Sequence, residues 1–155
     1  MTDTLDSSVP QRSLPSALIV AMRPRQWAKN VLVFAAPLAA GQLFVPEILL
    51  PSLGAFVVFC LISSATYLIN DIRDVESDRE HPKKHARPIA AGQLPVPMAV
   101  TAAVVLVAAS LSLAAVISWA LLGVVVAYAV FTLAYSMGLK HEPVIELALL
   151  ALGFL

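Results

Sequence analysis

Three apolar runs without a charged side chain constrain the fold of this chain most strongly. They cover residues 31–46, 48–70 and 88–139. A membrane-spanning helix needs about twenty apolar residues. The first run, extended by the turn around Trp27, and the second run each match one span, whereas the third is about twice as long. We therefore expect the third run to fold back near Ser118 and Trp119, giving helices over about residues 97–117 and 120–138.

The composition points to the same class of protein. Hydrophobic residues make up 59% of the 155 residues and charged residues 13%, whereas soluble domains carry about a quarter charged residues. The expected fold class is all-α, a polytopic transmembrane helix bundle. The formal net charge of zero gives no electrostatic support to a nucleic-acid partner. The one cysteine, Cys60, lies in an apolar run and is expected to be a small buried hydrophobe.

The two ends of the chain have different characters. Residues 1–13 are polar and aperiodic, which predicts a disordered cytoplasmic tail. A fifth span is expected to begin near Val144, and the chain stops inside it. We therefore expect a bundle truncated after about four and a half spans. Residues 14–155 would then be the N-terminal half of a longer transmembrane domain.

Basic residues occupy alternate connections between the expected spans. Basic residues lie at residues 23–29 before the first span and within residues 73–87 after the second span. Lys140 follows the fourth span. The connection after the first span carries only Glu47. By the positive-inside rule, we expect a multi-pass plasma-membrane protein whose N-terminus and polar connection after the second span are cytoplasmic.

The densest polar stretch, residues 67–92, holds three aspartates at helical spacing. They are Asp71, Asp74 and Asp78. If the second span continues as a helix past Asn70, these acids fall at i, i+3 and i+7 and share one face, with Asn70 one turn before the middle acid. Glu76 and Arg73 would be turned away from that face.

This acidic face suggests a metal site. Three like charges on one face repel one another, and a divalent cation would remove that penalty. Oxygen ligands without histidine or cysteine favour Mg²⁺, which binds through one or two carboxylates together with substrate phosphates. The pattern therefore indicates a metal-assisted departure of diphosphate from carbon. The expected metal ligands are Asn70, Asp71, Asp74 and Asp78, with Asp71 and Asp74 as the catalytic acids. The plainer alternative is a solvated helix end.

Basic and polar residues around this stretch are candidates for binding phosphate. Pro82 ends the helix, and the loop after it supplies two bases that could clamp phosphate oxygens. The candidates for phosphate or substrate binding are Arg25, Lys29, Asn30, Lys83, Arg87, Tyr135 and Lys140. Headgroup contacts explain the membrane-proximal ones equally well. His81 and His85 are interpreted as polar loop residues. Glu146 is either a helix-end acid or an active-site acid.

At these residues the sequence resembles the UbiA-type superfamily of intramembrane prenyltransferases. The first signature of that superfamily, N-D-x-x-D-x-x-x-D, is matched in full by Asn70, Asp71, Asp74 and Asp78. Within the superfamily, three segments look most like those of the decaprenyl-phosphate phosphoribosyltransferases. These segments are RPRQWAKNVLVFAAPLAAG, YLINDIRDVESDREHPKKHARPIAAG and YSMGLKHEPVIE.

The resemblance implies a UbiA-like helical bundle with a polar cytoplasmic cavity reached laterally by lipid. It implies transfer of 5-phosphoribose from phosphoribosyl diphosphate to decaprenyl (polyprenyl) phosphate, with release of diphosphate and assistance by Mg²⁺. This reaction belongs to the synthesis of cell-wall arabinan precursors. The second polar cluster of the superfamily lies in a later span and is absent from this sequence.

Two other functions stay open at this point. The first is transfer of a polyprenyl group from its diphosphate to an aromatic acceptor, which uses the same first signature. The second is a catalytically silent membrane subunit, or a half-protein that needs a partner to complete the bundle. A homo-oligomer is compatible with each of these functions.

Overall fold

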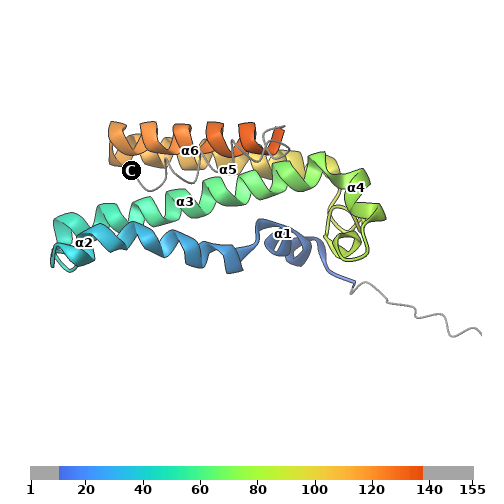
Figure 1. Ribbon diagram of the computed structural model, residues 1–155, viewed down its shortest axis with the longest axis horizontal. Helices are drawn as coiled ribbons and strands as arrows, with labels where there is room; N and C mark the ends of the chain where they lie inside the picture. Colours follow the sequence, from blue (N-terminus) through green and yellow to red (C-terminus); the bar gives the residue numbers. More distant parts are fainter. Residues whose placement is uncertain (1–10, 138–155) are drawn as a thin grey trace, which may run out of the picture.

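Helix α3 (Pro46–Arg73) is the longest element and runs along the whole molecule (Figure 1). The computed structural model describes residues 11–137, and every regular element in that range is helical. The others are α1 (Leu14–Met22), the 3-10 helix η1 (Pro24–Phe34), α2 (Ala35–Ala39), α4 (Val75–Glu80), the 3-10 turn η2 (Lys84–Ala86), α5 (Val96–Ile117) and α6 (Trp119–Met137). Helices α3, α5 and α6 are long and apolar enough to cross a membrane. The expected all-α transmembrane class is thus confirmed.

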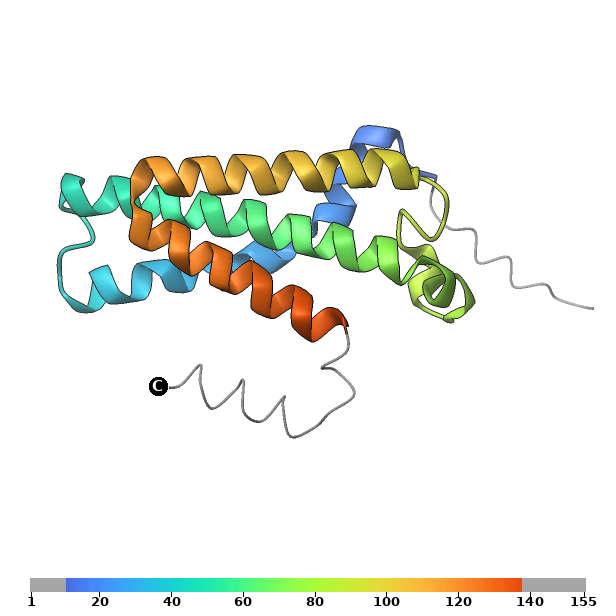
Figure 2. The same ribbon diagram turned by 90° about the horizontal axis from the view of Figure 1, so that it is seen from above.

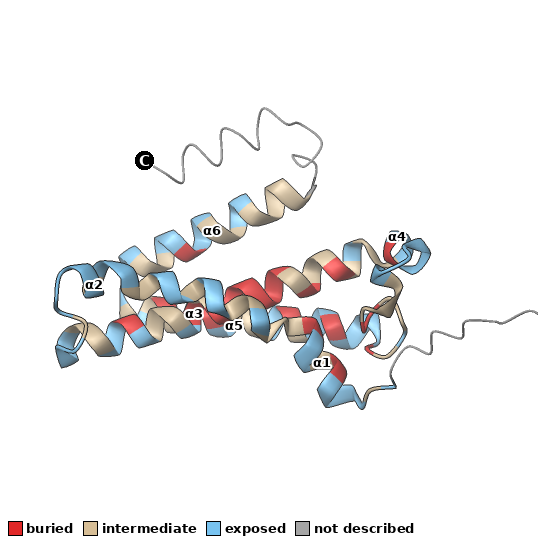
Figure 3. Cartoon of the chain, turned by 60° about the horizontal axis from the view of Figure 1, so that its bottom comes forward, coloured by how far each residue is buried: buried red, intermediate tan, exposed pale blue. Residues whose placement is uncertain are grey.

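Helix α3 is the centre of the bundle because it has neighbours on two sides. Helices α5 and α6 pack on one side, and the η1–α2 segment lies along the other (Figures 1 and 2). Small residues in the middle of α3, such as Ser63, Ser64 and Ala65, are buried (Figure 3). They let neighbouring backbones approach closely, as small residues do between membrane helices. Ser64 Oγ also donates to the carbonyl oxygen of Met22 at 3.1 Å, which ties the end of α1 to α3.

Two apolar clusters hold the elements together. One joins α3 to α1, the loop after α4 and the start of α5, through Ala17, Ala21, Leu68, Ile89, Leu94, Ala99 and Ala103. The other joins α3 to the opposite half of the α5–α6 hairpin, through Val58, Ile62, Ala114 and Val125. Cys60 is 6% exposed, so its assignment as a buried small residue is confirmed.

The expected reversal of the longest apolar run is confirmed at the expected residues. Helix α5 ends at Ile117 and α6 begins at Trp119, with Ser118 between them in an extended conformation (φ −167°, ψ 149°). Ser118 Oγ accepts a hydrogen bond from the backbone N–H of Leu121 at 3.0 Å. This side chain therefore caps the first turn of α6, where backbone donors lack helical partners.

The first expected span has different bounds in the structure. Its helical segment starts at Pro24 and ends at Ala39, and the chain then turns through Gly41, which has a positive φ of 67°. Most of the segment is 3-10 helix, which rises about 2.0 Å per residue, so η1 and α2 together extend about 30 Å, close to the thickness of a bilayer core. The expected span, residues 31–46 extended by the turn around Trp27, therefore begins about one turn earlier and ends at Ala39. The span expected from Val144 lies outside the described residues.

The polar segments gather at one end of the bundle. Helix α1, helix α4 and the loop that leads into α5 lie at the end of α3 marked by Arg73 (Figure 1). The turn between α2 and α3 and the turn at Ser118 lie at the opposite end (Figures 1 and 2). Segments far apart in the sequence are thereby brought around the aspartate stretch.

Candidate functional site

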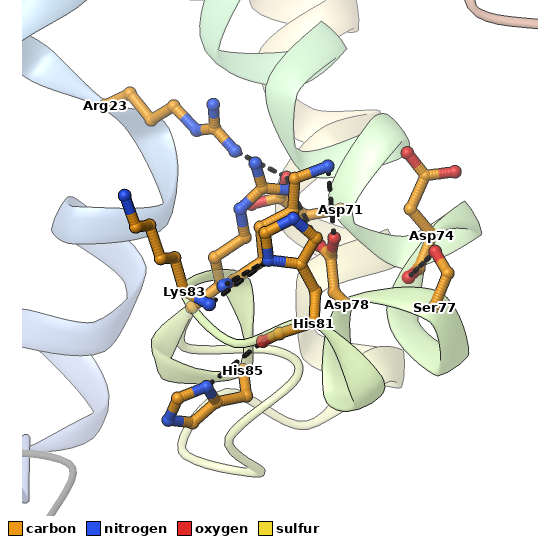
Figure 4. Close-up of polar contacts among 10 residues, drawn as sticks. Arg23, Asp71, Asp74, Ser77, Asp78, His81, Lys83 and His85 are labelled. Atoms are coloured by element: carbon orange, nitrogen blue, oxygen red, sulfur yellow. Dashed lines mark hydrogen bonds and ion pairs between the residues drawn. The ribbon is translucent and has the colours of Figure 1, made fainter. Parts of the chain in front are cut away.

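The aspartate stretch is not one continuous helix. Helix α3 ends at Arg73, and Asp74 has φ −91° and ψ 8°, outside the helical region. Helix α4 then starts a new direction (Figure 1), so the i+7 spacing no longer places Asp78 above Asp71. The expectation that the three carboxylates share one face was therefore wrong. Figure 4 shows Asp71 and Asp78 side by side and the Asp74 carboxylate apart from both.

Asp71 is almost fully buried and is bound by two arginines. Its side chain is 3% exposed. Arg23 Nη2 donates to Asp71 Oδ1 at 2.6 Å, and Arg87 Nη1 donates to the same oxygen at 3.2 Å. A buried carboxylate needs such partners, since a buried charge without one is costly. One arginine comes from the residue after α1 and the other from the loop before α5, so this acid joins three parts of the chain.

Asp78 is the second buried acid, with a side chain 2% exposed. Arg87 Nη1 donates to Asp78 Oδ2 at 2.6 Å, and Lys84 Nζ lies 4.0 Å from Asp78 Oδ1. Arg87 therefore bridges the two buried carboxylates. We call the set Arg23, Asp71, Asp78 and Arg87 the buried ion cluster.

Asn70 lies on the side of α3 that meets the end of α6, and Asp74 follows one turn later as the residue that ends α3. Ser136 Oγ donates to Asn70 Oδ1 at 2.5 Å, and Arg73 Nη1 donates to Ser136 Oγ at 3.1 Å. The Asp74 side chain has no hydrogen-bond or ion-pair partner within residues 11–137. Tyr135, next to the serine, is half-buried. Asn70 is thus held by α6, apart from the buried ion cluster.

The residues expected to point away from the acids do so. Glu76 is exposed and pairs with Arg79 at 2.8 Å. Arg73 is exposed and contacts α6 rather than the buried acids. His81 Nδ1 accepts hydrogen bonds from the backbone N–H groups of Lys83 and Lys84 at 3.1 and 3.3 Å. This contact shapes the loop, in agreement with the interpretation of His81 as a polar loop residue.

A cavity of about 260 Å³ lies beside the buried ion cluster. The charged residues of its wall are Arg23, Lys83, Arg87 and Asp71. The rest of the wall is formed by Val20, Ala21, Ala86 and Pro88. Two of the predicted phosphate-binding bases, Lys83 and Arg87, are therefore brought together at this cavity. Counting Asp78, which pairs with Arg87, three positive charges face two negative ones, and the net positive charge favours an anion.

Arg23 also belongs to this site, although it was not among the predicted phosphate-binding residues. It has a positive φ of 55°, a conformation that costs a residue with a side chain about 1 kcal/mol or more. The ion pair with Asp71 and a contact over the Tyr67 ring, at 4.8 Å from the ring centre, compensate for this strain. The only sequence signal is its position before Pro24, because a residue before proline avoids the helical conformation.

Other predicted candidates are not brought to this cavity. Asn30 turns toward α3, where its Nδ2 lies 3.4 Å from Cys60 Sγ and 3.5 Å from Ser63 Oγ. Lys29 is exposed on η1. Arg25 lies at a neighbouring hollow instead. Lys140 and Glu146 lie outside the described residues.

The chemistry of the signature residues fits Mg²⁺ bound together with a phosphate. Within residues 11–137, no three acidic, histidine or cysteine side chains converge as a closed metal site. Mg²⁺ needs only one or two carboxylates when phosphate oxygens and water complete its shell. Asp71 Oδ2 and Asp78 Oδ1 accept no hydrogen bond within the described part of the chain. These oxygens and the free Asp74 carboxylate are available as ligands.

Comparison with known proteins identifies related chains. A model of the UbiA prenyltransferase family matches residues 30–155. The decaprenyl-phosphate phosphoribosyltransferase of Corynebacterium glutamicum is 51% identical over 150 residues, which cover 94% of this chain and 45% of the relative. The protein of the same name from Mycobacterium tuberculosis is 49% identical over 150 residues, covering 94% of this chain and 50% of the relative.

A more distant relative has a different name. The digeranylgeranylglyceryl phosphate synthase of Methanoculleus marisnigri is 32% identical over 108 residues, covering 70% of this chain and 36% of the relative. The chain spans about half the length of the phosphoribosyltransferases it matches.

Proposed function

The chain belongs to the UbiA prenyltransferase family, and we propose that it contains the donor-binding part of a membrane-bound phosphoribosyltransferase. The complete protein would transfer 5-phosphoribose from phosphoribosyl diphosphate to decaprenyl or another polyprenyl phosphate. Diphosphate would be released, and the product would serve the synthesis of cell-wall arabinan and thus of arabinogalactan. About half of all aligned positions are identical to proteins named for this activity, which supports the choice of donor and acceptor.

The observation that carries the proposal is the basic cavity beside two buried acids. Arg23, Lys83 and Arg87 line a cavity of about 260 Å³. Guanidinium groups bind phosphate oxygens through paired hydrogen bonds. Because Asp71 and Asp78 hold the two arginines in place, their donors are oriented before the substrate arrives, and less entropy is lost on binding. A diphosphate group is the ligand best suited to such a cavity.

In the proposed reaction, the bond between the ribose carbon and the diphosphate oxygen breaks, and its electron pair leaves with the diphosphate. An oxygen of the lipid phosphate then forms the new bond to that carbon. Positive charges at the cavity stabilise the negative charge that grows on the leaving group, as preorganised donors do in general. The bases of this chain would therefore act mainly on the leaving group.

Mg²⁺ is proposed as the cofactor. The residues that would hold it are Asp71, which lines the cavity, Asp78, which shares Arg87 with it, and the signature residues Asn70 and Asp74. When bound there, the metal would neutralise part of the diphosphate charge.

We propose that the polar end of the bundle is cytoplasmic and that the protein resides in the plasma membrane. Arg12, Arg23 and the bases of residues 83–87 lie in segments at this end, while the turns at the opposite end have Glu47 as their one charged residue. Positive residues favour the cytoplasmic side. Water-soluble phosphoribosyl diphosphate would reach the cavity from that side.

A second candidate is transfer of a polyprenyl group from its diphosphate to an aromatic acceptor. The description of the family as prenyltransferases favours it, and a basic cavity would bind either diphosphate. The two reactions differ in the donor. Membranes that contain the full-length protein should incorporate label from phosphoribosyl diphosphate into lipid, and not label from polyprenyl diphosphate into an aromatic product. The opposite labelling pattern would overturn the proposal in favour of this candidate.

The proposed role of the buried acids can be tested in the same labelling assay. Asp71→Asn should reduce formation of lipid-linked phosphoribose by at least about tenfold, the loss expected when one charge-assisted contact is removed. Glu76→Gln is the matched control, because it removes an acid from the same stretch that lies outside the site and pairs only with Arg79. If both variants retain full transfer, the assignment of the acids is wrong.

A further inference from the structure

A second basic hollow adjoins the cavity of the proposed site. It has a volume of about 470 Å³ and is lined by Arg12, Val20, Arg23, Pro24, Arg25 and Gln26. We call it the arginine hollow. Arg23 and Val20 belong to the walls of both spaces, so the two spaces lie next to each other with this arginine between them.

The charge of the arginine hollow is positive and largely uncompensated. Three of its six lining residues are arginines and none is acidic. Arg23 is paired with Asp71, while Arg12 Nη1 donates to Gln93 Oε1 at 3.0 Å, a neutral partner. Arg25 is exposed and has no side-chain partner within residues 11–137. Within residues 11–137, these two guanidinium groups therefore keep most of their donors free, and phosphate is the anion whose geometry they match.

The hollow lies beside an apolar helix that is only partly covered. Helix α1 has the sequence LPSALIVAM and lies between Arg12 and Arg23. Its residues Ile19 and Val20 are 57% and 42% exposed. A short apolar helix with basic residues at both ends is typical of the membrane interface, where the apolar side chains contact acyl chains and the arginines reach the headgroups. A ligand of this hollow would therefore meet phosphate-binding groups and apolar surface together.

We propose that the arginine hollow binds the phosphate headgroup of a membrane lipid whose chain lies against the exposed side of α1. The identification of this lipid as the polyprenyl-phosphate acceptor rests on the proposed function. In that case Arg23 lies between the acceptor phosphate and the donor diphosphate, so the attacking oxygen would lie near the ribose carbon of the donor. The binding of a lipid phosphate does not itself depend on transfer.

The test measures binding by calorimetry, with full-length protein in a neutral detergent. The probes are a short-chain phosphatidate, the phosphocholine lipid with the same chains, and inorganic phosphate. Phosphatidate should bind tightest, because it alone combines an accessible phosphate with apolar chains. Arg12→Gln and Arg25→Gln should each weaken its binding by about tenfold, as expected for the loss of one charge-assisted contact. Arg79→Gln, an exposed arginine on α4, is the matched control and should bind as the unmodified protein does.

Three results would overturn the proposal. If Arg12→Gln and Arg25→Gln bind phosphatidate with the same affinity as the Arg79→Gln control, the arginines do not form the site. If inorganic phosphate binds as tightly as phosphatidate, the ligand is a free phosphate and not a lipid. If the phosphocholine lipid binds equally well, the chains alone account for binding.

A parallel titration with phosphoribosyl diphosphate separates this proposal from the proposed function. The Arg12→Gln and Arg25→Gln variants should retain donor binding, because neither residue lines the donor cavity. Absence of donor binding in the unmodified protein would contradict the proposed function and leave the lipid site standing. Retained donor binding with no phosphatidate binding would contradict only the lipid site.

Discussion

Arg23 and Asp71 are 48 positions apart in the sequence, yet Arg23 Nη2 lies 2.6 Å from Asp71 Oδ1. This ion pair connects the end of α1 to the last turn of α3. It also holds Arg23 in a left-handed backbone conformation, with φ 55°. The backbone strain at one residue is thus compensated by the charge of a buried acid on another helix.

This relationship predicts an order of stabilities at position 23. Arg23→Ala and Arg23→Gly both remove the partner of Asp71 and should both destabilise the protein. The glycine variant should be the more stable of the two by about 1 kcal/mol, because glycine adopts positive φ without a steric cost. Thermal unfolding of the full-length protein in detergent measures the difference. An alanine variant as stable as the glycine variant would show that the backbone conformation is not strained.

A second prediction concerns the bridge that Arg87 makes between Asp71 and Asp78. Arg87→Gln leaves Asp78 buried with only Lys84, 4.0 Å away, and should cost about 3 kcal/mol of stability. Adding Asp78→Asn removes the unpaired charge, so the double variant should be more stable than Arg87→Gln alone. A double-mutant cycle on unfolding free energies measures this coupling. Additive effects would mean that the two side chains do not interact.

Substitution of Asp74 should weaken donor binding without lowering the stability of the protein. Because its side chain has no partner within residues 11–137, Asp74→Asn should change the free energy of unfolding by less than about 0.5 kcal/mol. Under the proposed function it should also weaken Mg²⁺-dependent binding of phosphoribosyl diphosphate, measured by calorimetry with and without Mg²⁺. The Glu76→Gln control should change neither quantity. A loss of stability without a change in donor binding would identify Asp74 as a structural residue.

The contact between α3 and α5 can be tested at Gly54. A Cβ atom added there would lie 2.5 Å from Ile117 Cδ1, the end of a flexible side chain. Gly54→Ala should therefore be nearly neutral, since rotation of Ile117 relieves the clash and alanine favours the helix by about 1 kcal/mol. Gly54→Val should lower stability by about 1–3 kcal/mol, as overpacking does.

Gly123 on α6 is the matched control for this helix contact, because a Cβ added there meets nothing within 4 Å. Gly123→Ala should raise stability by up to about 1 kcal/mol. Equal effects of valine at both positions would contradict the close approach of α3 and α5 at Gly54.

The helices were predicted well where apolar length alone decides the structure. The reversal at Ser118, and helices α5 and α6 on either side of it, follow from a charge-free run about twice the length of a span. The 3-10 character of η1 was not predicted. Hydropathy measures the length of an apolar run and does not distinguish a 3-10 helix from an α-helix.

The spatial arrangement around the candidate site was predicted only in part. Asp71, Asp78, Arg87 and Lys83 lie near one another, because they belong to one short stretch of sequence, but Asp74 does not join them. Arg23 was missed as a site residue because its partner lies in a distant part of the chain. Asn30 was expected near the phosphates and instead contacts Cys60 and Ser63, because the η1 helix turns that side chain toward α3.

The sequence by itself determined the membrane class, the hairpin of α5 and α6, and the residue types of the site. These follow from local composition and spacing, which act within single segments. Only the tertiary structure decided which acids share partners. The break at Asp74 directs α4 away from the axis of α3, so Asp71 and Asp78 meet Arg87 while Asp74 faces elsewhere. The direction of a chain after such a break depends on packing against α1 and the loop before α5, which no local pattern encodes.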